Sequence, residues 1–348
     1  SSDLGTPVTD ELNVKFGNSV VVTDGVASAS ITGKASASRD TVGGSVSVNG
    51  VKSATVDVAS KAVVGGNLFV NARNGTDSES STEQSYVRDA KTGVATASEK
   101  IVSTSGDAAA QGNAAATIAG TVEGGTYVNA GRGNATVTLT GVSEDYVTAI
   151  ADGSVTKTTI EREWTGKTKS ASENFGTLVG SLTGRTLEES ITTEITRVGG
   201  KATVLVDSVQ ALKDKATAAT DDVYAYGVSG ASVEITKGSI IASDVEAESV
   251  AFNSVTTSTT SNDGKGTVNL ASETKTTIVG GPASVTNAGV IGDDVFVTSA
   301  TSATVTNTGK IGDNVSASAI VDGFNSSSET TNFGKASLQT ETVVFTPV

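Results

Sequence analysis

The sequence predicts an all-β fold, a parallel β-solenoid with coils of about 20 to 22 residues and one non-repeating insertion. The motif Val-Gly-Gly-x-apolar-x-Val occurs four times, beginning at Val42, Val64, Val198 and Val279. Near the end of the chain, residues 285–295 are repeated at 305–315 with eight of eleven positions identical. A short unit that recurs in this way is typical of stacked repeats, in which each coil buries its apolar face against its neighbours.

Each copy of the motif predicts a tight corner followed by a short strand. Paired glycines reach the positive φ values of a tight turn at little cost, and Asp is among the next most tolerant residues. Asp293 and Asp313 stand where the second glycine of the motif would be. After the corner the apolar residues alternate, as in Leu68 and Val70, so one face of the strand is expected to point inward.

The composition agrees with a thin interior. Val, Ala, Ser, Thr and Gly dominate, aromatic residues make up 4% of the chain and proline occurs three times in 348 residues. A narrow solenoid has room for small and β-branched side chains but for few rings, whereas a globular core of this size normally uses more Leu, Phe and Met.

The pattern predicts three regions. Residues 1–154 form an N-terminal solenoid block, interrupted near 74–108 by a polar segment that is either a long loop or a pair of projecting polar strands. Residues 155–227 form a non-repeating insertion with longer antiparallel strands, and residues 208–219 are its best helix candidate. Residues 228–348 form a C-terminal solenoid block that ends in a strand.

Charge and missing residue types exclude several functions. The formal net charge is −14, with 24 basic against 38 acidic residues, which disfavours a nucleic-acid partner. Cysteine and histidine are absent, so disulfides and His-dependent catalytic triads are excluded and no enzyme is expected. A start at Ser1 and an acidic, Ser/Thr-rich composition favour a processed, secreted chain. No apolar stretch is long enough for a transmembrane helix.

Three carboxylates form the candidate metal site. The 20-residue register is expected to place Asp293, Asp294 and Asp313 on one corner of adjacent coils, where they could bind calcium. The alternative is that they are turn residues that replace glycine. Calcium is the one cofactor that the sequence suggests.

The single tryptophan is the candidate ligand-binding residue. Trp164 follows Glu161, Arg162 and Glu163 and could stack on a carbohydrate. The alternative, which we favour, is that Trp164 anchors the non-repeating insertion against the rod.

Two terminal segments are candidate assembly strands. Val14 and Phe16 lie in an alternating N-terminal run, and Val343, Val344 and Phe345 lie in the C-terminal one. The C-terminal strand is either the last coil of its own chain or a strand that pairs with the open edge of a neighbouring molecule.

The coils with the pattern Val-Thr-Asn-x-Gly-x-Ile-Gly-Asp-x-Val, within residues 279–320, resemble the passenger β-helices of bacterial autotransporters and filamentous-haemagglutinin-like adhesins. The resemblance is architectural and carries over no functional residue. Together with the exposed strand edges and the terminal strands, it leads to our first hypothesis, a secreted, non-enzymatic structural protein that assembles with itself into an extracellular filament, sheath or surface layer. The alternatives are a monomeric adhesin that contacts glycans or surface proteins through residues 155–227, and a polysaccharide-degrading enzyme.

Overall fold

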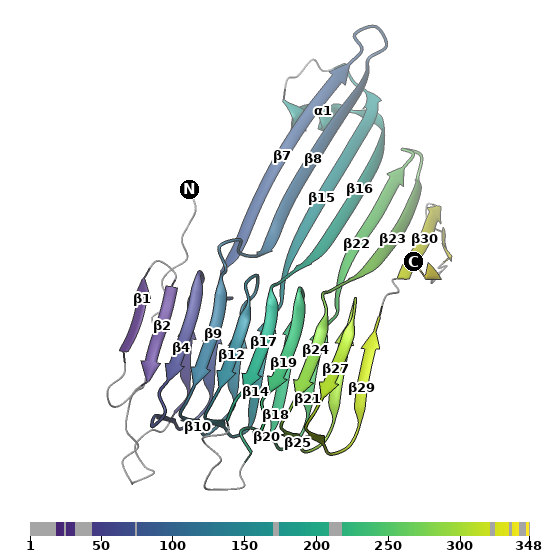
Figure 1. The fold of residues 1–348 in the computed structure, drawn as a ribbon. Coiled ribbons are helices and arrows are strands. Elements are labelled where there is room, and N and C mark those ends of the chain that lie inside the picture. Colours follow the sequence, from purple (N-terminus) through teal and green to yellow (C-terminus); the bar gives the residue numbers. More distant parts are fainter. Residues whose placement is uncertain are drawn as a thin grey trace.

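The computed structural model describes residues 19–23, 26–31, 44–73, 75–169, 174–208, 218–320, 324–333, 336–340 and 346–347. The described residues are mostly in β-strands, with one short helix among them. Figure 1 shows two parts: a row of short strands that form parallel sheets, here called the stack, and a sheet of long strands, the blade, which rises from the stack.

Sheet A is one side of the stack. Its strands pair in parallel except for β1, which lies antiparallel to β2 at the end of the sheet. In spatial order they are β1 (Ser19–Thr23), β2 (Val26–Ile31), β4 (Ser53–Val58), β9 (Asn113–Ile118), β12 (Ala135–Leu139), β17 (Lys201–Val206), β19 (Gly230–Ile235), β24 (Ala283–Asn287) and β27 (Ala303–Asn307).

Sheet B is parallel throughout. Its strands, in spatial order, are β3 (Val46–Asn49), β6 (Leu68–Asn71), β11 (Thr126–Asn129), β14 (Tyr146–Ala151), β18 (Asp222–Gly227), β21 (Val245–Ser249), β26 (Val295–Ser299) and β29 (Val315–Ala319). Two-residue strands link sheet A to sheet B and pair among themselves: β5 (Val63–Val64), β10 (Thr121–Val122), β13 (Val142–Ser143), β20 (Ile240–Ile241), β25 (Val290–Ile291) and β28 (Lys310–Ile311).

The register of the stack agrees with the repeat in the sequence. Val285 pairs with Val305 and Val295 with Val315, each 20 residues apart, as the C-terminal repeat predicts. Val46 pairs with Leu68, which is the predicted 22-residue offset. Identical spacing places equivalent side chains on the same face of consecutive strands. The all-β class with parallel sheets is therefore confirmed.

Small aliphatic side chains form the core of the stack. The inward positions of sheets A and B belong to a single cluster of buried Ala, Val, Leu and Ile, and no aromatic residue of the described chain is buried. Strands β6, β11 and β14 alternate between buried and half-buried residues, as one-sided strands should. The prediction of a thin interior without rings is correct.

The glycine motifs occupy two different corners. Gly66 and Gly124 precede strands of sheet B, and a Cβ at Gly124 would lie 3.0 Å from the backbone of Gly66. Gly200 and Gly281 instead precede strands of sheet A, where a Cβ at Gly281 would lie 2.0 Å from the Ser229 carbonyl. Close approach of stacked backbones requires glycine at both corners. Each of these copies is followed by a short strand, as predicted, but the motif marks two different corners of the coil.

The blade is an antiparallel sheet of hairpins. In spatial order its strands are β31 (Ala336–Thr340), β30 (Phe324–Phe333), β23 (Thr267–Val279), β22 (Ala251–Asn262), β16 (Thr183–Val198), β15 (Gly153–Lys167), β8 (Val94–Asp107) and β7 (Thr76–Arg88), with β32 (Thr346–Pro347) paired to β30. No residue of β16 is buried, and Thr76 to Val87 are exposed, so the blade has solvent on both faces over much of its area.

The hairpins leave the stack after alternate coils. Strands β6, β14 and β21 of sheet B continue into the blade, whereas β11, β18 and β26 return directly to sheet A. A hairpin is two strands wide, and two coils are two strands thick, because both spacings are about 4.8 Å. Hairpins on every second coil therefore meet edge to edge and form one sheet.

One short helix packs on the distal part of the blade. Helix α1 (Phe175–Ser181) is capped at its N-terminus by Asn174, whose side chain accepts a hydrogen bond from the Thr177 N–H at 3.0 Å. Leu178 is buried against Ala95 and Ala97 of β8. No helix within the described ranges has the length and hydropathy that a bilayer crossing requires.

The structure bears on three expectations about the organisation. The polar segment near 74–108 contains the paired strands β7 and β8, which agrees with the alternative of projecting polar strands and not with that of a long loop. The excursion after residue 153 ends at Val198, because β17 and β18 belong to the parallel sheets, so the insertion is shorter than 155–227. The helix candidate at 208–219 lies mostly outside the described residues.

Candidate functional site

The last coil of the stack exposes its inward side chains. Val315 is 52% exposed and Ile320 42%, while Val295, which pairs with Val315 one coil earlier, is fully buried. Strands β27, β28 and β29 lie at the ends of their sheets, so each pairs on one side only among the described strands. This open coil, residues 303–320, combines unpaired backbone groups with apolar side chains, which are the two features that recruit a further strand.

The two ends of sheet A differ. At the far end from the open coil, β1 runs antiparallel to β2, so a coil with parallel strands could not simply continue there. Sheet B ends in β3, which pairs only with β6 among the described strands. Among the described strands, sheet B therefore ends in an edge on both sides, while sheet A ends in a parallel edge only at β27.

The predicted assembly residues cannot be compared with this site. Val14, Phe16, Val343, Val344 and Phe345 all lie outside the described residues. The open coil was not among the sequence-based candidates, because only its position at the end of the stack distinguishes Val315 from the buried Val295.

The predicted metal residues lie together on the corner before sheet B. We call Asp222, Asp244, Asp293, Asp294 and Asp313 the aspartate corner. In one column the backbone N–H of Asp313 donates to the carbonyl of Asp293 at 3.1 Å. In the neighbouring column each carboxylate accepts the backbone N–H of the next coil: Asp222 from Asp244 at 3.2 Å, and Asp244 from Asp294 at 2.9 Å. Asp294 in turn accepts from Asn314 at 2.6 Å.

The carboxylate trio of this corner differs from the predicted one. Asp244, Asp293 and Asp294 offer oxygen atoms within 4.8 Å of one another, which suits a hard cation such as calcium. Asp313 stacks next to Asp293 but is not in this trio. Asp244 was missed because the β22–β23 hairpin separates it from its partners in sequence. The signal was the shared frame Ile241-x-x-Asp244-Val245 and Ile291-x-x-Asp294-Val295.

The electrostatics of the corner act mainly on Asp293. Desolvation at the corner, followed by repulsion from Asp294, Asp244 and Asp313, raises the pKa of the Asp293 carboxyl. The hydrogen-bonded column explains Asp244 and Asp294 as structural turn residues without an ion. Calcium binding at this corner stays a prediction.

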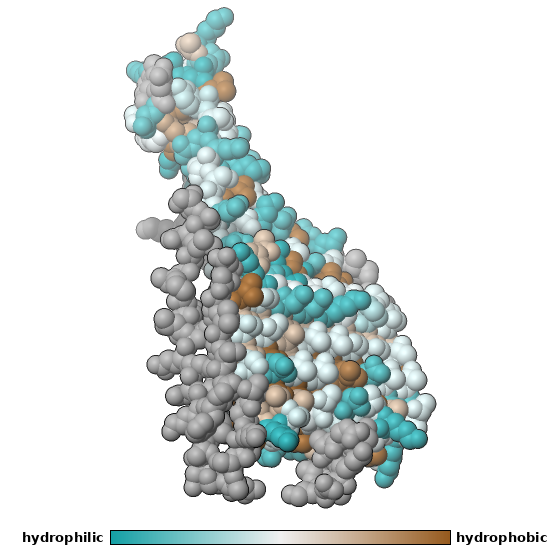
Figure 2. Space-filling view, turned by 60° about the vertical axis from the view of Figure 1, so that its left-hand side comes forward, coloured by the Kyte–Doolittle hydropathy of each residue, from teal (hydrophilic) through white to brown (hydrophobic). Residues whose placement is uncertain are grey.

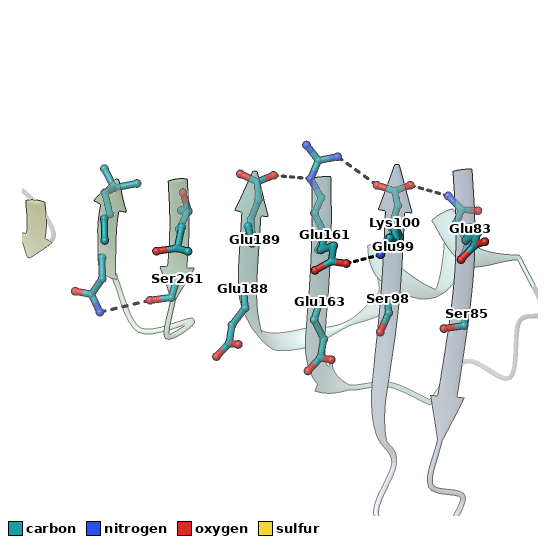
Figure 3. A pocket seen from close by; sticks show the side chains of 18 residues that line it. Glu83, Ser85, Ser98, Glu99, Lys100, Glu161, Glu163, Glu188, Glu189 and Ser261 are labelled. Atoms are coloured by element: carbon teal, nitrogen blue, oxygen red, sulfur yellow. Dashed lines mark hydrogen bonds and ion pairs between the residues drawn. The ribbon is translucent and has the colours of Figure 1, made fainter. Parts of the chain in front are cut away.

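A groove of about 830 Å³ runs across the blade (Figure 3). On one face, Arg162 of β15 donates to Glu189 of β16 at 2.5 Å and to Glu99 of β8 at 3.2 Å, and Glu99 accepts from Gln84 of β7 at 2.7 Å. These bonds form a line across four strands in Figure 3. The bond with Glu189 is the main reason that the pKa of Arg162 is raised further above its ordinary value.

The groove is acidic, and three of its carboxylates form ion pairs. Its lining holds six glutamates, Glu83, Glu99, Glu161, Glu163, Glu188 and Glu189, and two cations, Lys100 and Arg162. Lys100 forms an ion pair with Glu161 at 2.8 Å, in addition to the bonds of Arg162. Paired carboxylates of this kind hold neighbouring strands together on a sheet with no second layer.

Trp164 is half-buried on the blade. Its ring meets Phe175 of α1 edge-on at 5.8 Å between centroids, and it contacts the cluster around Leu178. The ring therefore holds α1 against β15, and these contacts lie within the blade and not against the stack, where an anchor to the rod was expected. Its use as a carbohydrate platform stays a prediction.

No family model, no curated protein and no solved structure matches the chain.

Proposed function

We propose that the protein is a secreted, non-enzymatic structural protein whose stack closes into a β-solenoid and assembles with further copies into an extracellular filament, sheath or surface layer. The single buried cluster shared by sheets A and B supports a closed coil, since inward residues of both sheets pack on one another. The resemblance of residues 279–320 to passenger β-helices of bacterial surface proteins supports the location.

The open coil carries the assembly proposal. A second copy that continues the stack would pair with β29 and cover Val315, Ala317 and Ile320. Complete burial of Val315, which is half exposed, would contribute on the order of 1 kcal/mol, and the unpaired edge of β29 would gain a backbone partner. Because β3 is the other edge of sheet B, head-to-tail contact between β29 and β3 of the next copy would repeat without closing, which produces a filament.

The test compares two substitutions in β29. Val315→Glu places a charge on the inward face of the open coil, and Ser316→Glu places the same charge on the neighbouring outward position. Purified wild-type protein should form rods that lengthen with concentration in electron micrographs and light scattering. Val315→Glu should remain monomeric, and Ser316→Glu should assemble like the wild type. Monomeric wild-type protein at high concentration, or equal assembly of both variants, would overturn the proposal.

A further inference from the structure

The aromatic residues of the stack lie outside its core, on the outward face of sheet B. Phe69, Tyr127, Tyr224 and Phe296 all belong to one row of paired positions, Ser47, Phe69, Tyr127, Thr148, Tyr224, Glu246, Phe296 and Ser316, which crosses the eight described strands of the sheet. These rings are half-buried or exposed, and Phe296 is 37% exposed. The other two aromatic residues of this face, Tyr146 and Tyr226, stand in the rows on either side. A thin interior explains why rings are not inside, but it does not explain why four of the six share one row.

The spacing of three rings is regular. Tyr127, Tyr224 and Phe296 stand on β11, β18 and β26, the coils without a hairpin, with one strand between each pair. Two strand spacings amount to about 10 Å. This distance is close to the length of two sugar units in an extended β-linked polysaccharide, so successive disaccharides could each place a ring face on one aromatic side chain.

Hydrogen-bonding groups flank the aromatic row on both sides. The next row on the blade side contains Asn71, Asn129 and Glu248, and the row on the corner side contains Asp244 and Asp294. The Tyr224 hydroxyl donates to Glu248 at 3.2 Å, which fixes the ring's outer end. Amide and carboxylate oxygens beside a stacking platform are the groups that bind sugar hydroxyls.

The negative charge of this face favours a neutral polymer over an anionic one. No outward position in the described strands of sheet B carries Lys or Arg, whereas Asp222, Glu246 and Glu248 are acidic. An anionic polysaccharide would be repelled, and the whole chain carries a net charge of −14. A neutral polymer meets no such penalty.

We propose that the outward face of sheet B binds a neutral, extended, β-linked polysaccharide that lies along the stack across Tyr127, Tyr224 and Phe296. The sugar rings stack on the aromatic side chains, and the flanking Asn and Glu side chains bind the hydroxyl groups. This binding does not depend on assembly, because the open coil and the aromatic row are separate surfaces.

The experiment measures binding of cellohexaose and chitohexaose by titration calorimetry and co-sedimentation with insoluble cellulose and chitin. Phe296→Ala removes a ring that is 37% exposed on sheet B, and Tyr86→Ala removes one that is 38% exposed on the blade. Phe296→Ala should weaken binding about tenfold, since one stacking contact contributes roughly 1.4 kcal/mol, and Tyr86→Ala should leave it unchanged. Tyr127→Ala removes a second ring of the same row and should also weaken binding, with circular dichroism to check that the variant is folded.

Several outcomes would overturn the proposal. They are the absence of binding to either neutral polymer, equal weakening by Phe296→Ala and Tyr86→Ala, or binding to polygalacturonate in preference to neutral chains. Loss of self-assembly in Phe296→Ala with no effect on sugar would instead identify the row as a contact between copies. The monomeric Val315→Glu variant should still bind the sugar, which separates this proposal from the assembly proposal.

Discussion

Single polar side chains stabilise this protein by bonding from one coil to the next. Asn287 is completely buried, and its amide donates to Asn307 at 2.9 Å and to the Lys310 carbonyl at 3.1 Å while its oxygen accepts from Gly289. A buried amide with every group paired is stabilising, and one left without partners is costly. Asn287 and Asn307 occupy equivalent positions of the repeat, and their side chains are hydrogen-bonded from one coil to the next.

The two asparagines should differ in their effect on stability. Asn287→Ala should lower the free energy of unfolding by about 1–3 kcal/mol, because it leaves buried backbone groups unpaired. Asn307→Ala should cost less, because Asn307 is exposed in the open coil. Urea unfolding of the monomeric protein measures both. Equal effects would show that burial does not control the strength of this ladder.

Asp293 should make stability depend on pH. Its pKa is raised in the folded state, so the folded protein is destabilised at pH values above the raised pKa, and the penalty disappears below the ordinary pKa of aspartate, where folded and unfolded chains are both protonated. Asp293→Asn should therefore raise the melting temperature at neutral pH and have no effect in acid.

A suitable control is Asp57→Asn, which changes an exposed aspartate on β4, away from the corner. It should leave the melting temperature unchanged at both pH values. Added calcium provides a second measurement: if the trio binds it, calcium should stabilise the wild type and not Asp293→Asn. A lower melting temperature for Asp293→Asn at neutral pH without calcium would contradict the repulsion argument.

At the scale of elements, the blade depends on cross-strand contacts and on one local cluster. Strands β8, β15 and β16 align Ile101, Ile160 and Ile191 in one row, and Arg162 links Glu99 to Glu189 in the next row on the same face. Cross-strand pairs of this kind each contribute about 0.2–1 kcal/mol. Helix α1 adds the blade's own buried cluster around Leu178.

Leu178→Ala should loosen α1 without unfolding the stack. Removing a buried leucine costs about 2–5 kcal/mol where the site cannot collapse. The cost falls on a cluster that includes the single tryptophan, so Trp164 fluorescence should shift to the red while the circular dichroism of the sheets is retained. Leu270→Ala, a half-exposed position elsewhere on the blade, should leave the fluorescence unchanged. A complete loss of β signal in Leu178→Ala would show that the blade and the stack unfold together.

At the scale of the molecule, a period of two coils organises both parts. Hairpins leave after β6, β14 and β21, and the coils between them connect sheet B to sheet A directly. The positions Ser249 and Ala283 that flank one hairpin pair with Ser299 and Ala303, which a three-residue link joins. The same fold position therefore accepts either a long hairpin or a short turn.

This equivalence predicts the result of removing a hairpin. Replacing residues 250–282 by Ala-Thr-Ser, the link that follows Ser299, should preserve the register of β21 and β24 in the stack. It should also leave a gap two strands wide in the blade, so β16 loses the partner β22. Hydrogen exchange should show faster exchange in β16 and unchanged protection in β19. Loss of protection in β19 would mean that the stack depends on a continuous blade.

The sequence by itself determined the parallel pairing of adjacent coils in the stack. Val285 and Val305 occupy equivalent positions in two repeats that follow each other directly in the chain. Spacing and alternation therefore predict which residues pair and which face inward. The pairing of Val46 with Leu68 was predicted for the same reason, and both registers are as expected.

Only the tertiary structure decided the blade and the surface sites. A sheet with solvent on both faces needs no alternation of apolar residues, so the exposed strand β7 carries no pattern that distinguishes it from a polar loop. Asp244 lies beside Asp293, and Tyr224 lies in the same row as Phe296, although the β22–β23 hairpin separates each pair in the sequence. The hairpin leaves the stack and returns, so its length does not change which coils are neighbours. The spacing of residues along the sequence predicts a coil where consecutive coils follow directly. Where a hairpin intervenes, the tertiary structure decides which coil lies next to which.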